Sequence, residues 1–274
     1  MAEPTGPTGP TGQTDEMEET GHGARGRYLY AVCRGLDIKE LGGLLGIGEV
    51  LVEGVEHDDL VGLVSSVDLD EFGEEGLRRN LERLDWLEMA ARGHDAVVQA
   101  AAAVAPTAPM RLATIFRNDD GVRHRLAEQQ DRIAEVLDRV EGHDEWSVKV
   151  LTRQDAESEK PAEAPPSSGV EYLRRRQEVQ RAREGDRRDA DLVAEQLHEA
   201  LLGIAAASRR LPPQDPRLTG HTGTMVLNVA YLVPQDRSEA FTAAIGEFTQ
   251  RHAEVLIDAR GPWPPYSFAT LEDQ

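Results

Sequence analysis

Residues 261–268, which read GPWPPYSF, decide how the end of this chain is built. Three prolines within four positions cannot lie inside a helix or a central strand, because proline lacks an amide proton and has a fixed φ. Trp263, Tyr266 and Phe268 are gathered here, although aromatic residues make up only 5% of the chain. A rigid ribbon can present large side chains at low entropic cost. We therefore expect residues 261–268 to form a strap that closes over a domain or binds a partner.

The sequence before the strap predicts alternating strands and helices in the second half of the chain. Apolar and polar residues alternate along the predicted strands, whereas the helices repeat their apolar residues every three or four positions. Ser238 is expected to cap the last helix. The predicted strands are 144–153, 224–233 and 255–259, and the predicted helices run from about residue 169 to Pro212 and over 239–252.

The first half of the chain predicts several strands, a helix, a further strand and a second helix. Gly93 weakens the first helix, and Asn118 or Asp119 can cap the second. The predicted strands are 27–33, 49–55, 60–67 and 110–116, and the predicted helices are 74–91, continued over 94–105, and a segment that follows Asp119 and carries apolar residues as far as Val140.

Together these patterns predict an α+β protein with two domains. We expect each domain to be a mainly antiparallel sheet with helices packed on one face, and the C-terminal domain to be ferredoxin-like. Residues 1–23 should be a disordered acidic tail rich in Gly and Pro, followed by domains at 24–142 and 143–270. Residues 154–168, which end in PAEAPPSS, should be a flexible insert in the second domain.

Composition limits the kinds of partner that the chain can have. Its 274 residues carry 50 acidic side chains against 30 Lys and Arg, a formal net charge of −20. This charge disfavours phosphate backbones and anionic membranes. No apolar run reaches the roughly 20 residues that span a bilayer, and no secretory signal is recognisable.

Cys33 is the only cysteine, which excludes an intrachain disulfide and predicts a buried, inert thiol. We expect a cytoplasmic protein.

Motifs that would indicate catalysis or cofactor binding are incomplete. The glycines of residues 43–48 are spaced as in a phosphate-binding loop, but Glu49 stands where that loop needs lysine. The histidines form no zinc-binding motif, and no serine-hydrolase elbow is present. An enzyme of unknown class stays open as an alternative, with a site assembled in space from His94, His143 or His198 and nearby carboxylates.

A second alternative is an RNA-binding ferredoxin-like module. Arg174, Arg175 and Arg176 form a basic cluster on the predicted long helix, but acidic residues nearly match the basic ones there. A solvated, salt-bridged helix face is therefore the preferred interpretation. The predicted strand 224–233 also contains only Tyr231, and not the several exposed aromatic residues on which RNA bases stack.

Six segments carry a family resemblance through their order along the chain: YLYAV (28–32), PMRLATIF (109–116), EWSVKV (145–150), SGVEYLRRR (168–176), LNVAYLV (227–233) and the strap. Together they resemble the GvpL/GvpF family of gas vesicle proteins, over about residues 26–269. Two departures fall at Leu112 and Ala113, where the family motif has Phe and Gly, and a third is Ser147, where Gly is usual.

The resemblance implies a non-enzymatic accessory protein of gas vesicle assembly, located at the gas vesicle, with two α+β domains. Such proteins are minor vesicle components that bind the small hydrophobic shell protein and other accessory proteins. From the charge and the incomplete motifs, we expect no cofactor, no metal, no nucleic acid and no lipid membrane as a partner.

The candidate residues for partner contact are the aromatic residues of the strap and the basic cluster. Intramolecular packing is the competing interpretation for the strap, because three aromatic rings can bury several hundred Å² inside a fold. A Trp263 ring in the core would make Trp263→Ala cost about 3–5 kcal/mol. The candidates are Trp263, Tyr266, Phe268, Arg174, Arg175 and Arg176.

Overall fold

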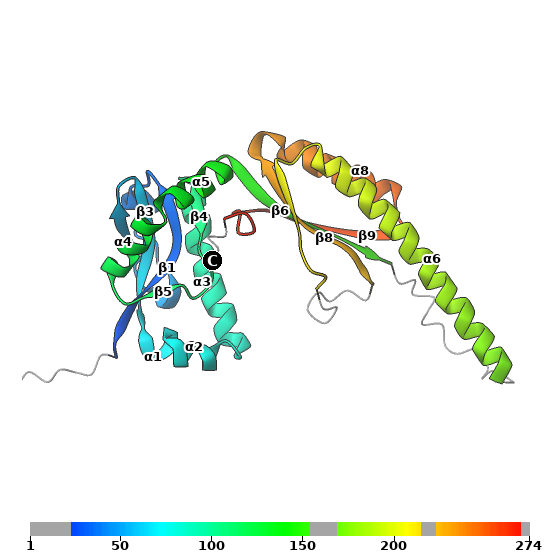
Figure 1. The fold of residues 1–274 in the computed structure, drawn as a ribbon, viewed down its shortest axis with the longest axis horizontal. Helices are drawn as coiled ribbons and strands as arrows, with labels where there is room; N and C mark the ends of the chain where they lie inside the picture. Colours follow the sequence, from blue (N-terminus) through cyan, green and yellow to red (C-terminus); the bar gives the residue numbers. More distant parts are fainter. Residues whose placement is uncertain (1–22, 154–168, 215–222, 270–274) are drawn as a thin grey trace, which may run out of the picture.

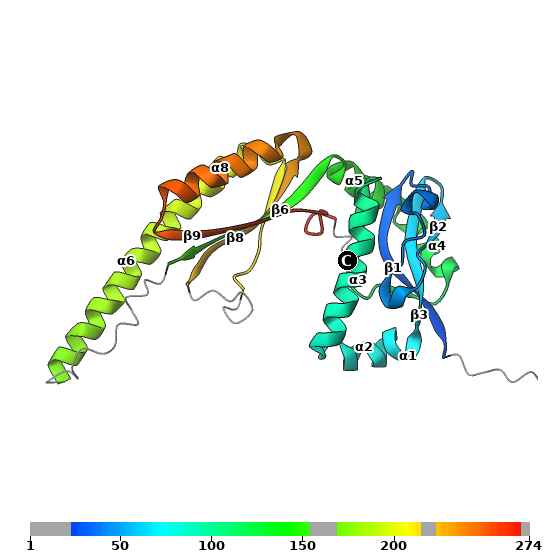
Figure 2. The same cartoon turned by 180° about the vertical axis from the view of Figure 1, so that it is seen from behind.

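The computed structural model describes residues 23–153, 169–214 and 223–269. Within them the chain forms two antiparallel sheets, one in each half of the sequence, with helices packed against both (Figure 1; Figure 2). The predicted α+β class is thereby confirmed. The predicted tail, apart from Gly23, and the predicted insert at 154–168 lie outside the described residues. No helix in the described part of the chain is long and apolar enough to cross a membrane.

The first sheet is built around β1 (Arg25–Arg34), which is buried along most of its length. The strands lie in the order β2 (Glu53–His57), β3 (Leu60–Asp68), β1 and β4 (Thr107–Pro109). The short β5 (Ile115–Phe116) also pairs with β1. All of these pairings are antiparallel, and β1 and β3 share the longest ladder.

Helices cover both faces of this first sheet. Tyr28 and Tyr30 point into a core shared with α3, whereas Leu29 and Val32 point into a core shared with α4 and α5. The prediction of helices on one face is therefore wrong for this half, because β1 presents apolar side chains on both of its faces. The helices are α1 (Leu69–Phe72), α2 (Glu74–Asn80), α3 (Leu84–Ala102), α4 (Asp119–Glu128) and α5 (Gln130–Val140).

The break in the first predicted helix lies at residues 81–83 and not at Gly93, which sits inside the continuous α3. A Cβ atom at Gly93 would lie 3.0 Å from the Ile47 side chain and 3.2 Å from its Cα. Gly93 therefore lets the short 3-10 turn Ile47–Glu49 approach α3 closely. That turn also shortens the predicted strand at 49–55, which begins only at Glu53.

A single strand over 110–116 was also a wrong prediction, because a turn separates β4 from β5. Ala113, in this turn, has φ 63°, in the left-handed region that favours glycine. Its N–H donates to the Tyr28 hydroxyl at 3.0 Å, and the Thr114 carbonyl accepts from Leu29 N–H at 2.9 Å. The turn is thus fixed to β1 by hydrogen bonds that no local pattern reveals.

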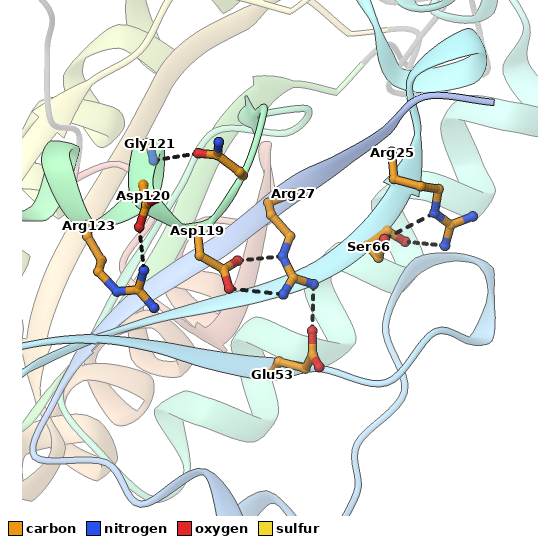
Figure 3. A network of polar contacts seen from close by, with 9 residues as sticks. Arg25, Arg27, Glu53, Ser66, Asp119, Asp120, Gly121 and Arg123 are labelled. Carbon is orange, nitrogen blue, oxygen red and sulfur yellow. Dashed lines mark hydrogen bonds and ion pairs between the residues drawn. The ribbon is translucent and has the colours of Figure 1, made fainter. Parts of the chain in front are cut away.

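Arg27 connects β1, β2 and the start of α4 through a network of polar contacts (Figure 3). Its guanidinium lies between the carboxylates of Asp119, at 2.5 Å, and Glu53, at 2.5 Å. The hydrogen bond from Arg27 lowers the pKa of Asp119, and the Asp119 charge lies favourably at the N-terminus of α4. Asn118 caps this helix by accepting from Gly121 N–H at 2.9 Å, as predicted.

The second sheet has the order β7 (Ala207–Arg210), β8 (Met225–Pro234), β6 (His143–Thr152) and β9 (Val255–Trp263). Its pairings are antiparallel. One core joins this sheet to two helices, which lie on the same side of it (Figure 1). The order along the chain is β-α-β-β-α-β, and the finer ferredoxin-like assignment stays a prediction, as do the boundaries of the two domains.

The two helices of this half are α6 (Gly169–Leu202) and α8 (Ser238–Arg251). The packed stripe of α6 begins at Ala190, and the earlier part of the helix extends past the sheet (Figure 2). The helix ends at Leu202, well before Pro212, because the unpredicted β7 follows it. The predicted Ser238 cap is wrong: Arg237 occupies the cap position, and the buried Ser238 Oγ has no hydrogen-bond partner among the described residues.

We predict that Ala113→Gly raises the free energy of unfolding by about 1 kcal/mol. Glycine adopts φ 63° without the steric cost that alanine bears there. The measurement is urea unfolding at equilibrium. The matched control is Ala96→Gly, an exposed alanine in the interior of α3, where the same change should lower the unfolding free energy by about 1 kcal/mol. A loss of stability in both variants would contradict the interpretation.

Candidate functional site

The strap leaves the second sheet and packs against the first half of the chain. Residues 261–263 complete β9, so this edge strand is longer than predicted. A Cβ atom at Gly261 would lie 2.9 Å from the Glu145 carbonyl oxygen, so the register shift in the pairing of β9 with β6 requires glycine here. Farther on, Phe268 and the buried Ala269 join the core between β1 and the α4–α5 helices.

Glu145, on β6, holds the strap by two hydrogen bonds. Its carboxylate accepts from the Ser267 N–H at 2.6 Å and from the Ser267 hydroxyl at 2.7 Å. The Ser267 carbonyl in turn accepts from Arg209 of β7 at 2.8 Å. Burial raises the pKa of Glu145, and the bonds from Ser267 oppose that rise. A buried carboxylate without such donors would be strongly destabilising, so Glu145 and Ser267 depend on each other.

Tyr266 fastens the strap to α3. Its hydroxyl donates to Asp95 at 3.1 Å, and its ring centroid lies 6.2 Å from that of His94. Asp95 also accepts from Gln99 at 2.6 Å. Burial raises the pKa of Tyr266, so the hydroxyl stays protonated and can donate. Through Glu145 and Asp95, the strap is bonded to one element of each half of the chain.

His94, on α3, lies in a buried chain of polar groups. Its Nδ1 is 3.0 Å from the Tyr28 hydroxyl, which already accepts from Ala113 N–H. Burial lowers the pKa of His94 to about 4, against the opposing effects of Asp95 and of the Met110 backbone. If the Tyr28 proton goes to Nδ1, the neutral ring carries its own proton on Nε2. In this tautomer only the Nε2–H lacks a partner among the described residues. In the other tautomer, both Nε2 and the Tyr28 hydroxyl proton would lack one.

A hollow of about 840 Å³ lies beside these residues. Its wall combines α3, the turn at 111–114, Arg125 of α4, Gln129 after that helix, and Tyr266. Leu112 and Ala113, in that turn, both line it. The hollow is lined by one carboxylate, that of Asp95, and by three arginines, Arg92, Arg111 and Arg125.

The sequence profile described as "Gas vesicle synthesis protein GvpL/GvpF" matches residues 26–270 of this chain. The chain belongs to the GvpL/GvpF family. It is 41% identical to gas vesicle protein L of Streptomyces sp. (strain CB03234) over 252 residues, which cover 90% of this chain and 94% of that protein. Gas vesicle protein F of the same strain is 28% identical over 180 residues, which cover 64% and 75%.

Two solved GvpF structures share the fold. The crystal structure of GvpF from Anabaena sp. PCC7120 has a TM-score of 0.64 and 19% identity, with 91% of this chain and 98% of that chain covered. GvpF from Microcystis aeruginosa gives a TM-score of 0.64 at 18% identity, with 90% and 99% covered. Both matches extend over the two sheets, so the GvpL/GvpF fold accounts for nearly the whole described chain.

The predicted contact residues of this GvpL/GvpF protein do not form one patch. Trp263 is 43% exposed at the end of β9 and lies outside the core, whereas Tyr266 and Phe268 are half-buried in the fold. The basic cluster lies near the start of α6, at the opposite end of the second half from the strap (Figure 1; Figure 2). Arg174 and Arg176 are exposed there, Arg174 pairs with Glu178 at 3.4 Å, and Arg175 lies between them in the same helix.

The three histidines of the enzyme alternative lie in separate places. His94 bonds Tyr28 in the first half, His198 lies 2.6 Å from the Tyr231 hydroxyl in the core of the second, and His143 contacts a backbone carbonyl at the surface. The described part of the chain contains no group of three or more His, Cys, Asp or Glu that could hold a metal. Tyr231 is fully buried beneath α6 and α8, so it offers no surface on which a base could stack.

We expect Glu145→Ala to lower the free energy of unfolding by about 2–4 kcal/mol, because the Ser267 N–H and hydroxyl lose their buried acceptor. The matched control is Glu145→Gln, whose amide can accept from the N–H and donate to the hydroxyl, and which should cost less than about 1.5 kcal/mol. Urea unfolding at pH 7 measures both. Equal losses in the two variants would show that the strap does not depend on these bonds.

The buried His94 should make stability depend on pH. Its folded-state pKa of about 4 lies below the ordinary value of 6.5, so the unfolded chain binds the proton first. The resulting stability loss begins as the pH falls through about 6.5 and reaches about 3 kcal/mol near pH 4. Urea unfolding between pH 7 and 4.5 should show this loss, and His94→Gln should remove that part of it. An NMR titration midpoint for His94 above 6 would contradict the prediction.

Proposed function

We propose that this protein is a non-enzymatic accessory protein of gas vesicle assembly that binds the small hydrophobic shell protein. The observation that carries the proposal is the 41% identity to a gas vesicle protein L over nine-tenths of both chains. Its place of action is then the gas vesicle, and its other partners are further accessory proteins. Neither nucleic acid nor a lipid membrane suits a chain with a net charge of −20.

A physical need for such a partner supports the proposal. A shell subunit that will face gas on one side exposes apolar surface before it is incorporated, and exposed apolar surface drives aggregation. A strongly acidic protein can keep such a subunit in solution if it also offers apolar contact surface. Trp263 and Val104, which are 43% and 47% exposed, are large apolar residues of this kind. Both line a hollow of about 460 Å³, and the strap prolines line it too.

The basic cluster is a second proposed contact. The first part of α6 extends past the sheet and carries Arg174 and Arg176 in exposed positions. An acidic accessory protein could bind such an exposed helix through charge pairs, although exposed pairs contribute little each. We assign the apolar shell protein to the strap side, because Trp263 and Val104 there line a common hollow.

Co-purification tests the proposal. A tagged full chain, co-expressed with the gas vesicle shell protein, should retain that protein, and Trp263→Ala should reduce the recovered amount severalfold. Leu84→Ala, which removes another exposed apolar side chain at the far end of α3, is the matched control and should leave recovery unchanged. Failure of the unmodified chain to retain the shell protein, together with normal vesicles after deletion of its gene, would end the proposal.

Stability separates a contact role for Trp263 from a structural one. Because the ring is 43% exposed, Trp263→Ala should lower the free energy of unfolding by only about 1–2 kcal/mol. A core tryptophan would cost about 3–5 kcal/mol. A large shift of the melting temperature in this variant would mean that lost folding, and not a lost contact, explains any loss of recovery.

A further inference from the structure

We propose that the 840 Å³ hollow between α3, the turn at 111–114 and Tyr266 is a docking cavity for an amphipathic helical segment of the shell protein. The segment presents large apolar side chains to the cavity and carboxylates to its rim. This inference rests on the proposed function and assigns a second surface to it. The cavity is separate from the hollow beside Trp263, and no residue lines both.

Size and lining identify the apolar part of the occupant. Cavities of roughly 300–1,000 Å³ are typical of ligand sites, and this volume exceeds what one side chain fills. Met110, Leu112 and Phe116 are half-buried and line the wall, so part of each side chain remains uncovered. Two or three apolar side chains, spaced three or four residues apart on a helix, would cover them.

Charge identifies the polar part of the occupant. Arg92, Arg111 and Arg125 stand at the cavity although acidic residues outnumber basic ones by 20 in the whole chain. Arg111 is exposed, and its guanidinium has no partner among the described residues. The single carboxylate of the lining, Asp95, already accepts from Tyr266 and from Gln99. Arg92 pairs with Glu88 on the same helix, and Arg125 also has an interaction within the chain. Arg111 is therefore the rim arginine from which a carboxylate on the docked segment can accept a bidentate bond.

The cavity also has a fixed wall, which limits the cost of binding. The turn at 111–114 is held to β1 through Tyr28 and Leu29, and Tyr266 is held by Asp95. Both attachments exist before any partner arrives. A preorganised wall loses little conformational entropy when a ligand binds.

Two variants test the cavity, each with a matched control. Ala91→Trp places a large ring on the exposed α3 residue that lines the cavity, and Ala96→Trp makes the same change on an exposed α3 residue outside it. Arg111→Glu reverses a rim charge, and Arg117→Glu reverses an exposed charge that lies outside the cavity. Each tagged full-length variant is co-expressed with the shell protein, and the recovered ratio of the two proteins is measured.

We expect Ala91→Trp and Arg111→Glu to lower the recovered ratio at least tenfold, and both controls to stay within twofold of the unmodified chain. Circular dichroism and melting curves verify folding, and Arg111→Glu decides the question alone if Ala91→Trp does not fold. Equal recovery with all four variants overturns the cavity assignment and leaves the proposed function standing. No recovery with the unmodified chain refutes the proposed function itself.

Self-association is the remaining outcome. If the unmodified chain dimerises in sedimentation experiments, and Ala91→Trp abolishes the dimer without changing recovery of the shell protein, then a second copy fills the cavity. That result would also overturn the assignment.

Discussion

The buried pairing of Glu145 with Ser267 is the constraint on which the arrangement of the two halves depends. It joins a strand of the second sheet to a segment that then enters the core of the first half. A buried carboxylate tolerates little displacement of its donors, because an unsatisfied charge costs several kcal/mol. The strap therefore has a defined path, and this path also fixes the shape of the surfaces beside it. Tyr266 borders one hollow, and the strap prolines border the other.

Local periodicity was enough to predict most of the elements. The strands around Tyr30, Val64 and Val229 and the helices around Leu137 and Phe241 all follow apolar patterns that strand and helix geometry impose. The errors have a common cause. The short polar strand β7 and the turn at 111–114 are specified by pairing with distant partners, and no apolar period marks them. Helices on both faces of the first sheet follow from residues that are apolar at successive positions of β1, a pattern that a central strand allows.

The candidate site was predictable only in part. Prolines and aromatic residues marked Trp263, Tyr266 and Phe268, because their local density is unusual in this chain. Asp95 and Glu145 gave no such signal, since their partners lie 171 and 122 residues away. The arginines at the cavity gave no sequence signal either. Arg92, Arg111 and Arg125 lie on separate elements, so only folding brings them to one cavity. The visible cluster, Arg174 to Arg176, is contiguous but lies at the opposite end of the second half from the strap (Figure 1).

The strained backbone at Ala113 lies in the surface that we propose as a docking site. An alanine at φ 63° costs about 1–2 kcal/mol relative to ordinary backbone, and surrounding contacts must stabilise it. Those contacts are the bond to Tyr28 and, behind it, the buried ring of His94. The Tyr28 bond and the His94 ring are not needed to fill the core, because apolar residues could occupy the same space without desolvating a histidine. Strained backbone that is held by a buried polar chain is typical of surfaces whose exact shape matters. The turn at 111–114 is such a surface, because it forms the wall against which a partner helix would rest.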